Sequence, residues 1–169
     1  PPPPPPPPPP PFESSAASDV YKRQVLERSA SDPADPLGDT TLGEALLAPT
    51  RIYVRNVLAL LEAHRIDGLA HITGGGITEN IVRVLPGDLG IEVALDAWDR
   101  PAVFDWLQRE GAIEEREMLR TYNCGICMVL IVTEATAHAV AEAARALGEN
   151  CTDIGVVTPI AGDERVRYR

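Results

Sequence analysis

The residues best suited to chemistry in this sequence lie around three consecutive glycines. An apolar stretch at residues 68–73 ends in Thr73 and is followed by Gly74, Gly75 and Gly76, after which polar residues open a helix. Glycines permit positive φ angles and let a ligand approach the backbone closely, and amides at a helix N-terminus attract anions. The segment therefore predicts a strand, a turn and a helix start whose amides bind a phosphate group.

Two side chains on the following helix are expected to add donors to this phosphate site. Asn80 and Arg83 are three residues apart and so share a helix face. The pattern is not a Walker A loop, because no Gly-Lys-Ser/Thr follows, and it is not the Rossmann fingerprint, because Glu79 stands at the third glycine position. The alternative is a tight turn that needs small residues and holds no ligand.

A histidine and a cysteine pair nearby are further candidates. His71 falls on the expected buried strand, where a hydrogen-bonded core histidine is favoured over a catalytic base. Cys124 and Cys127 form a C-x-x-C, which is found in redox pairs and in half of many zinc sites. A zinc site needs a second pair, and a redox pair is expected at a helix start, whereas this one precedes an apolar run. We therefore predict reduced thiols and no metal site.

The elements that must position these residues alternate between helices and strands. We expect α/β (α+β) architecture, with a mixed sheet covered by helices. The expected helices are residues 42–48, 51–64, 79–85, 101–110 and 134–147. The expected strands are residues 68–73, 91–95, 126–132, 154–157 and 166–168, with the very apolar 126–132 as a central strand.

Local signals set the ends and faces of the helices. Thr41 and Glu44 have the spacing of a capping box. Thr50 is a candidate N-cap for residues 51–64. That helix is expected to turn one apolar stripe toward the core; the stripe consists of Val54, Val57, Leu58 and Leu61.

The first part of the chain differs from the rest. Residues 1–11 are an unbroken proline run, which is either a ligand for a proline-binding module or, as we prefer, a sequencing artefact. Residues 12–24 show no helical or strand period, so residues 1–24 are expected to be disordered. Residues 25–39 are expected to be a connecting segment, and residues 40–169 one folded domain.

Composition narrows the class of protein. The formal net charge of -10 and the pI of about 4.7 argue against nucleic-acid binding. No apolar run is long enough to cross a membrane. With three cysteines, an odd and small number, the chain is typical of a cytoplasmic protein with reduced thiols.

Three ordered motifs resemble those of the aminoimidazole ribonucleotide synthetases, or phosphoribosylformylglycinamidine cyclo-ligases. They are residues 47–53 (LAPTRIY), residues 71–86 with the glycines, and residues 120–125 (RTYNCG). The resemblance extends from about Val25 to the end of the chain. It implies the C-terminal domain of that superfamily. The family pattern has glycine where Cys127 stands, so this chain departs from it there.

The resemblance implies an ATP-dependent ligase of purine biosynthesis that closes formylglycinamidine ribonucleotide into aminoimidazole ribonucleotide. ATP phosphorylates the amide oxygen, an internal nitrogen attacks the activated carbon, and phosphate leaves. The family's N-terminal half supplies the Mg²⁺ ligands, much of the nucleotide site and most of a homodimer interface. This chain alone is therefore expected to be an inactive part of a cytoplasmic enzyme.

The resemblance also implies roles for individual residues. The turn with Asn80 and Arg83 is expected to bind a phosphate of ATP or of the ribonucleotide. Substrate-binding roles fall on Thr50, Arg51, Tyr53 and Asn123. The alternatives are a solvated arginine, a packed tyrosine and a turn asparagine.

Two other functions compete with this interpretation. One is another ATP-binding enzyme of the same superfamily, such as a selenide or thiamine-phosphate kinase or the formylglycinamidine ribonucleotide amidotransferase. The motifs at residues 49–53 and 120–125 argue against it. The other is a non-enzymatic module, either proline-tailed or metal-binding through the C-x-x-C.

Overall fold

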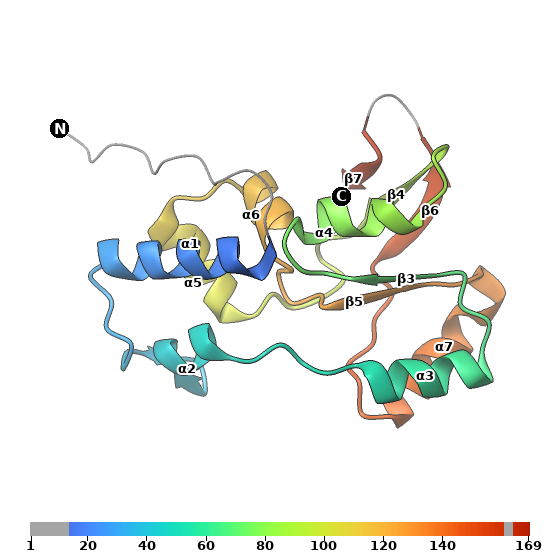
Figure 1. Cartoon of the computed structure of the whole chain (residues 1–169), viewed down its shortest axis with the longest axis horizontal. Helices are drawn as coiled ribbons and strands as arrows, with labels where there is room; N and C mark the ends of the chain where they lie inside the picture. The colour runs from blue at the N-terminus through green and yellow to red at the C-terminus, as the bar shows by residue number, and fades with distance from the viewer. Residues whose placement is uncertain (1–13, 161–163) are drawn as a thin grey trace. The chain divides into compact units, whose positions relative to one another are not determined.

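The computed structural model describes residues 14–160 and 164–169 of the chain (Figure 1). It divides into two compact units. Among the described residues, unit 1 runs to Pro49 and includes Thr73–Ile77 and Arg100–Gly125, and unit 2 comprises Thr50–Ile72, Thr78–Asp99 and Ile126–Arg169. The proline run at residues 1–11 lies outside the described residues.

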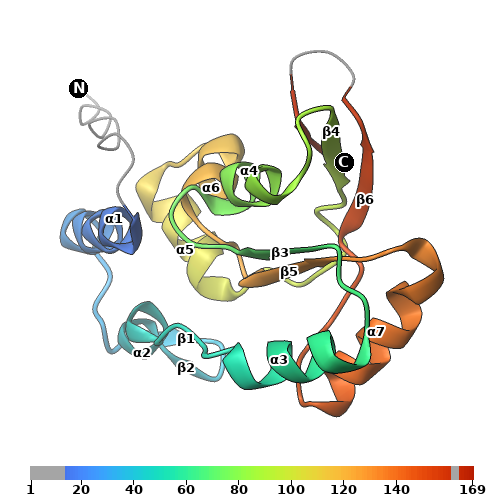
Figure 2. The same cartoon turned by 45° about the vertical axis from the view of Figure 1, so that its right-hand side comes forward.

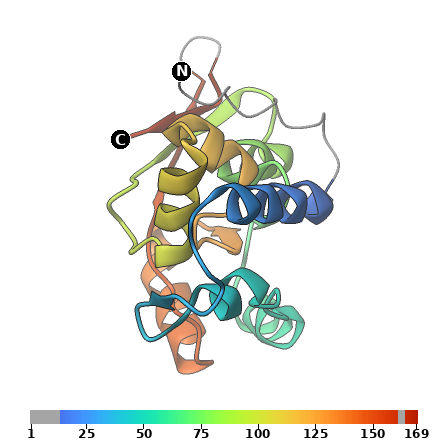
Figure 3. The same ribbon diagram turned by 90° about the vertical axis from the view of Figure 1, so that its left-hand side faces the viewer.

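Unit 1 consists of helices and one short hairpin. Its helices are α1 (Ser14–Arg28), α2 (Leu42–Leu47), α5 (Ala102–Gly111) and α6 (Glu115–Thr121), and its strands are β1 (Pro36–Leu37) and β2 (Thr40–Thr41). Helix α5 packs against α1, α2 and α6, and Figure 3 shows α1 beside α5. The core holds Trp106, Leu107, Met118 and Leu119.

Helix α1 corrects the expectation that residues 12–24 lack regular structure. It begins at Ser14 and crosses the boundary expected between residues 24 and 25. The helix has no clear apolar stripe, so the sequence pattern gave no signal for it. Tertiary contacts hold it instead, because Val25 is buried against α5 and the Tyr21 ring meets the Tyr122 ring edge-on, with centroids 6.3 Å apart.

The capping box at the start of α2 is confirmed. The Glu44 amide donates to Thr41 Oγ1 at 3.3 Å, and the Thr41 amide donates to Glu44 Oε2 at 3.1 Å. Hydrogen bonds from Thr40 and Thr41 lower the pKa of Glu44 below its ordinary value. The box satisfies amides that a helix start otherwise leaves unpaired.

Unit 2 contains two small sheets and three helices. Strand β3 (Gly68–His71) pairs antiparallel with β5 (Met128–Ile131), with His71 opposite Met128. In the second sheet β4 (Leu89–Val93) lies between antiparallel β6 (Gly155–Pro159) and parallel β7 (Val166–Tyr168). The helices are α3 (Val54–Ala63), α7 (Glu134–Ala146) and the 3₁₀ helix η1 (Ile81–Val84). Short α4 (Gly76–Asn80) begins in unit 1 and ends in unit 2.

The expected α/β class is confirmed, with helices and small mixed sheets. Figure 2 shows β3 beside β5 and α3 beside α7. Helix α7, β6 and β7 lie close to their expected positions. Gly148, which has a φ of +83°, follows the end of α7 as expected. Strand β4 begins two residues earlier than expected, and the helix expected at 79–85 is divided between α4 and η1.

Two expectations about individual elements are wrong. Among the residues that the structure describes, strand β5 pairs with β3 alone and is not central. An apolar run indicates burial above and below a sheet and not the number of hydrogen-bonded neighbours. Helix α6 was not among the helices expected from the sequence. It buries Met118 and Leu119.

Helix α3 differs from expectation at its start and on its faces. It begins at Val54, with Tyr53 at the N-cap position and no side-chain cap, so Thr50 does not cap it. Its buried residue is Leu60, whereas Val54 and Leu58 of the expected core stripe are exposed. An apolar stripe identifies a face to be covered, but it does not say by what.

Replacing Thr41 by alanine tests the capping box. Thr41→Ala removes the side-chain acceptor for the Glu44 amide and is expected to lower the free energy of unfolding by about 1 kcal/mol in urea titrations. Thr133→Ala is the matched control, because Thr133 is the N-cap of α7 but makes no side-chain cap hydrogen bond. Equal losses in the two variants would contradict the assigned role of the box.

Candidate functional site

A groove of about 390 Å³ in unit 2 brings together several of the predicted residues. It lies where the chain enters α3, where β3 ends and where β5 begins. The groove is lined by Arg51, Ile52, Tyr53, Val54, Val57, Leu58, His71 and Met128. Two of the four predicted substrate-binding residues, Arg51 and Tyr53, therefore share one cavity with the candidate base His71.

Tyr53 is the polar centre of this groove. Its ring meets the His71 ring edge-on with centroids 6.5 Å apart, and the Arg51 guanidinium carbon lies 6.0 Å from the Tyr53 centroid. Burial, and then a hydrogen bond with Cys127, raise the pKa of Tyr53 well above its ordinary value. The phenol is therefore neutral near pH 7.

Arg51 is held in place by the end of α7. Its Nη2 lies 3.2 Å from Glu149 Oε2 and donates to the Gly148 carbonyl at 3.3 Å. Asn56 Nδ2 on α3 donates to the other oxygen, Glu149 Oε1, at 2.5 Å. Glu149 thus fixes the segment that carries Arg51 and Tyr53. Sequence reasoning missed it, because no spacing signal links residues 98 positions apart along the chain.

His71 is exposed, so the expectation of a core histidine is wrong. It is the last residue of β3, where the strand leaves the sheet, and its ring lies at the groove beside Tyr53. The apolar stretch at residues 68–73 predicted a buried strand, but such a stretch does not decide whether the last residue of the strand is covered. His71 is accessible to a ligand of this groove.

The triple glycine forms a tight turn. The Gly76 amide donates to the Thr73 carbonyl at 3.0 Å, and Gly75 and Gly76 have φ values of +96° and +55°. A Cβ added at Gly76 would lie 2.2 Å from the carbonyl oxygen of Leu119. The expectation that every glycine amide is offered to a phosphate is therefore wrong at Gly76, whose amide closes the turn and whose missing side chain admits the α6 backbone.

The other two predicted phosphate ligands, Asn80 and Arg83, belong to unit 2. Asn80 is buried and its Oδ1 accepts from Arg83 Nη1 at 3.4 Å, while Arg83 Nη2 lies 3.9 Å from Glu79 Oε2. The Thr73–Gly76 turn belongs to unit 1. A phosphate site shared by the turn, Asn80 and Arg83 stays a prediction.

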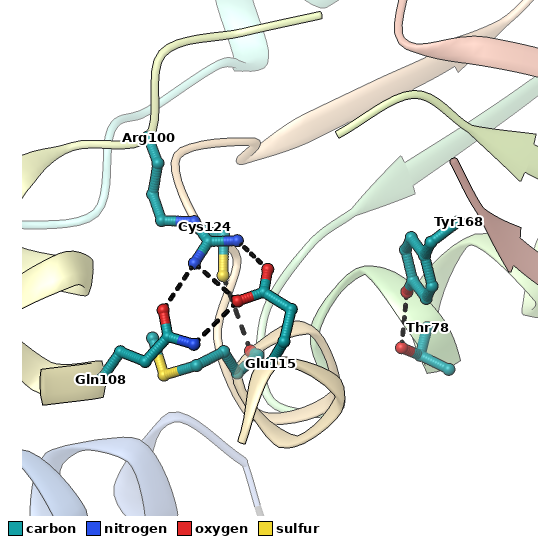
Figure 4. A network of polar contacts seen from close by, with 7 residues as sticks. Thr78, Arg100, Gln108, Glu115, Cys124 and Tyr168 are labelled. Carbon is teal, nitrogen blue, oxygen red and sulfur yellow. Dashed lines mark hydrogen bonds and ion pairs between the residues drawn. The ribbon is translucent and has the colours of Figure 1, made fainter. Parts of the chain in front are cut away.

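A network of polar contacts in unit 1 lies beside Cys124 of the RTYNCG segment (Figure 4). Arg100 forms a bidentate ion pair with Glu115, and Gln108 Nε2 donates to Glu115 Oε2 at 2.8 Å. Figure 4 also shows, in unit 2, the hydroxyls of Thr78 and Tyr168, which are 2.6 Å apart. Hydrogen bonds from Arg100 are the main reason why the pKa of Glu115 is lowered below its ordinary value.

Cys124 and Asn123 have structural partners in this segment. Cys124 is buried, its thiol donates to the Met118 carbonyl at 3.6 Å, and burial raises its pKa to about 12. Such a thiol is a poor nucleophile and a poor metal ligand. Asn123 Oδ1 accepts from the Gly125 amide at 3.1 Å, which is the turn arrangement considered as its alternative role.

The described residues contain no group of three or more His, Cys, Asp and Glu side chains placed to hold a metal ion. None of the described helices is long and apolar enough to span a bilayer.

The fold and the groove define an α/β domain with a candidate ligand site at the start of α3. A family model described as AIR synthase related protein, C-terminal domain, matches residues 14–166. The chain therefore belongs to this family.

Two curated relatives support the assignment. A phosphoribosylformylglycinamidine cyclo-ligase of Xanthomonas oryzae pv. oryzae is 51% identical over 148 residues, which is 86% of this chain and 43% of that protein. An enzyme of the same name from Nitrosococcus oceani is 49% identical over 147 residues, 86% of this chain and 41% of that protein. The chain thus spans less than half the length of the relatives it matches.

Replacing Gly76 by alanine tests the packing role of the turn. Gly76→Ala adds both a positive-φ penalty and a clash with the Leu119 carbonyl, so we expect the free energy of unfolding to fall by roughly 3 kcal/mol. Gly148→Ala is the matched control, because Gly148 also has positive φ but no atom lies within 4 Å of the added Cβ. It is expected to lose about 1 kcal/mol. Similar losses at both positions would refute the close approach.

The Arg100–Glu115 pair predicts a pH dependence. Because the folded-state pKa of Glu115 is lowered, its stabilisation is complete above the unfolded value and is lost as pH falls through the folded value. Glu115→Gln is expected to lose about 1 kcal/mol near pH 7 and to converge with the parent protein as pH falls through the lowered folded-state pKa of Glu115. Glu142→Gln, which removes the exposed pair with Arg145, should change stability by less than about 0.5 kcal/mol. A pH-independent difference for Glu115→Gln in thermal melts would be contrary evidence.

Proposed function

We propose that this chain is the carboxy-terminal part of a phosphoribosylformylglycinamidine cyclo-ligase, a ligase that uses ATP to close the imidazole ring of aminoimidazole ribonucleotide. The observation that carries the proposal is 51% identity over 148 residues to a relative of that name, together with the family match over residues 14–166. This level of identity favours the cyclo-ligase over the selenide and thiamine-phosphate kinases of the same superfamily.

The groove is the proposed binding site for part of the substrate. Arg51 supplies a positive charge suited to a phosphorylated ligand, and the neutral phenol of Tyr53 supplies a hydrogen-bonding group beside it. His71 contributes an imidazole to the groove lining and is the candidate for moving a proton during ring closure.

The chemistry requires more than this chain holds. In the proposed reaction the amide oxygen of the substrate accepts the γ-phosphoryl group of ATP, and the internal nitrogen then attacks the activated carbon. The new C–N bond forms as the C–O bond to phosphate breaks. Mg²⁺ supplies charge neutralisation when bound, and its carboxylate ligands are proposed to lie in the preceding part of the polypeptide, as is a homodimer interface. We also propose a cytoplasmic location, as part of the assignment to purine biosynthesis.

Turnover measurements test this assignment. The chain alone, mixed with formylglycinamidine ribonucleotide, ATP and Mg²⁺, is expected to show no phosphate release. The same chain joined behind the residues that precede the match in the Xanthomonas relative should release phosphate together with the closed imidazole product. Turnover by the chain alone, or a folded joined protein without coupled ring closure, would overturn the proposal.

Substitution in the groove tests its role in the joined protein. Arg51→Ala should raise the KM for the ribonucleotide roughly 10- to 100-fold, as expected for the loss of one charged hydrogen-bonding group. His138→Ala on the exposed surface of α7 is the control and should leave the KM unchanged. A normal KM in Arg51→Ala would place the substrate elsewhere.

A further inference from the structure

The segment that carries Arg51 and Tyr53 has little regular structure of its own. Residues 50–53 belong to no helix or strand among the described elements, and α3, which follows them, begins without a side-chain cap. The Tyr53 carbonyl accepts from the Val57 amide at 2.9 Å, which ties the end of the segment to the helix. The position of the Arg51 side chain therefore depends on contacts with other parts of unit 2.

Glu149, which follows α7, supplies such contacts through both of its carboxylate oxygens. Oε2 lies 3.2 Å from Arg51 Nη2, and Oε1 accepts from Asn56 Nδ2 at 2.5 Å. The Glu149 side chain is only 13% exposed. Next to it, the Gly148 carbonyl accepts from Arg51 Nη2 at 3.3 Å. A carboxylate that is shielded from solvent and hydrogen-bonded at both oxygens holds its partners in one geometry.

These contacts engage only one nitrogen of the Arg51 guanidinium. Both are made by Nη2, and within the described part of the chain neither Nη1 nor Nε has a hydrogen-bond partner. The Arg51 side chain is 54% exposed and lines the groove beside the Tyr53 ring. A guanidinium presents several donors in a rigid fork, so one anchored nitrogen still leaves donors for a phosphate group.

We propose that Glu149 is a positioning residue, which holds the Arg51 guanidinium at the groove so that its remaining donors meet the phosphate group of the ribonucleotide. The inference rests on the proposed function for the identity of that ligand. An arginine side chain has many rotamers, and ordering it during binding costs free energy. Glu149 orders the side chain before the ligand arrives, and the dissociation constant is lower as a result.

The opposite role for Glu149 would be that of a competitor, because a carboxylate also neutralises the arginine that an anion needs. Two observations favour positioning. The carboxylate is shielded from solvent and is bonded to Asn56 as well as to Arg51, so it serves as a fixed anchor. It also binds Nη2 alone, whereas a bidentate pair would occupy the fork. The two roles predict opposite effects on ligand binding when the charge is removed.

Binding of formylglycinamidine ribonucleotide to the joined protein, measured by calorimetry in the absence of ATP, tests the proposal. Glu149→Ala is expected to raise the dissociation constant roughly tenfold. The double variant Arg51→Ala/Glu149→Ala should bind no more weakly than Arg51→Ala alone, because Glu149 acts through Arg51. Glu142→Ala removes an exposed carboxylate paired with Arg145 on α7, and this matched control should leave binding unchanged.

Glu149→Gln keeps the test decisive if the alanine variant does not fold, because glutamine preserves the size of the side chain and removes its charge. The positioning role predicts weaker binding in Glu149→Gln as well, whereas the competitor role predicts tighter binding. Unchanged or tighter binding in the variants of Glu149 overturns the proposal. Losses that multiply in the double variant also overturn it, because they show an effect of Glu149 that does not pass through Arg51.

The same measurements separate this proposal from the proposed function. Because ATP is omitted, weaker binding in the Glu149 variants without further loss in the double variant supports positioning even if the joined protein does not close the ring. Ring closure together with normal binding in Glu149→Ala overturns positioning alone. Normal binding in Arg51→Ala overturns positioning and the substrate role of the groove, while ring closure would still support the cyclo-ligase assignment.

Discussion

The carboxylate of Glu149 is the contact on which the arrangement of the groove depends. Its two oxygens lie against Arg51 and Asn56, so one side chain after the end of α7 holds both the segment before α3 and the helix itself. The side chain is mostly buried, and a buried carboxylate is stable only when its oxygens are satisfied. Because Arg51 and Tyr53 lie in the segment held by Glu149, the placement of Tyr53 beside His71 follows from this contact.

The family resemblance predicts that the glycine motif binds a phosphate. The structure shows that Gly76 is also required for packing, because the α6 backbone leaves no space for a side chain at this position. The Gly76 amide closes the turn onto Thr73. A ligand role for the turn stays a prediction, and it depends on groups other than the Gly76 amide.

Much of the fold could be predicted from local patterns, and the errors share one cause. The capping box at Thr41 and the end of α7 at Gly148 were predicted correctly, because the groups that decide them are neighbours in sequence. Helix α1, helix α6 and the edge position of β5 were not, because contacts between distant segments decide them. For the site, motif resemblance predicted binding roles for Arg51 and Tyr53, whereas the groove that they share with His71 is visible only in the structure.

The sequence by itself determined the family, the order of most elements and the apolar stripe on α3. These features depend on residue identity and on the spacing of residues close in sequence, which are the same whatever tertiary structure the chain adopts. Only the tertiary structure decided that this stripe faces outward, that His71 is exposed, and that Glu149 anchors Arg51. Hydrophobic periodicity states that a face must be covered, whereas the covering surface is chosen by the packing of segments far apart in the chain.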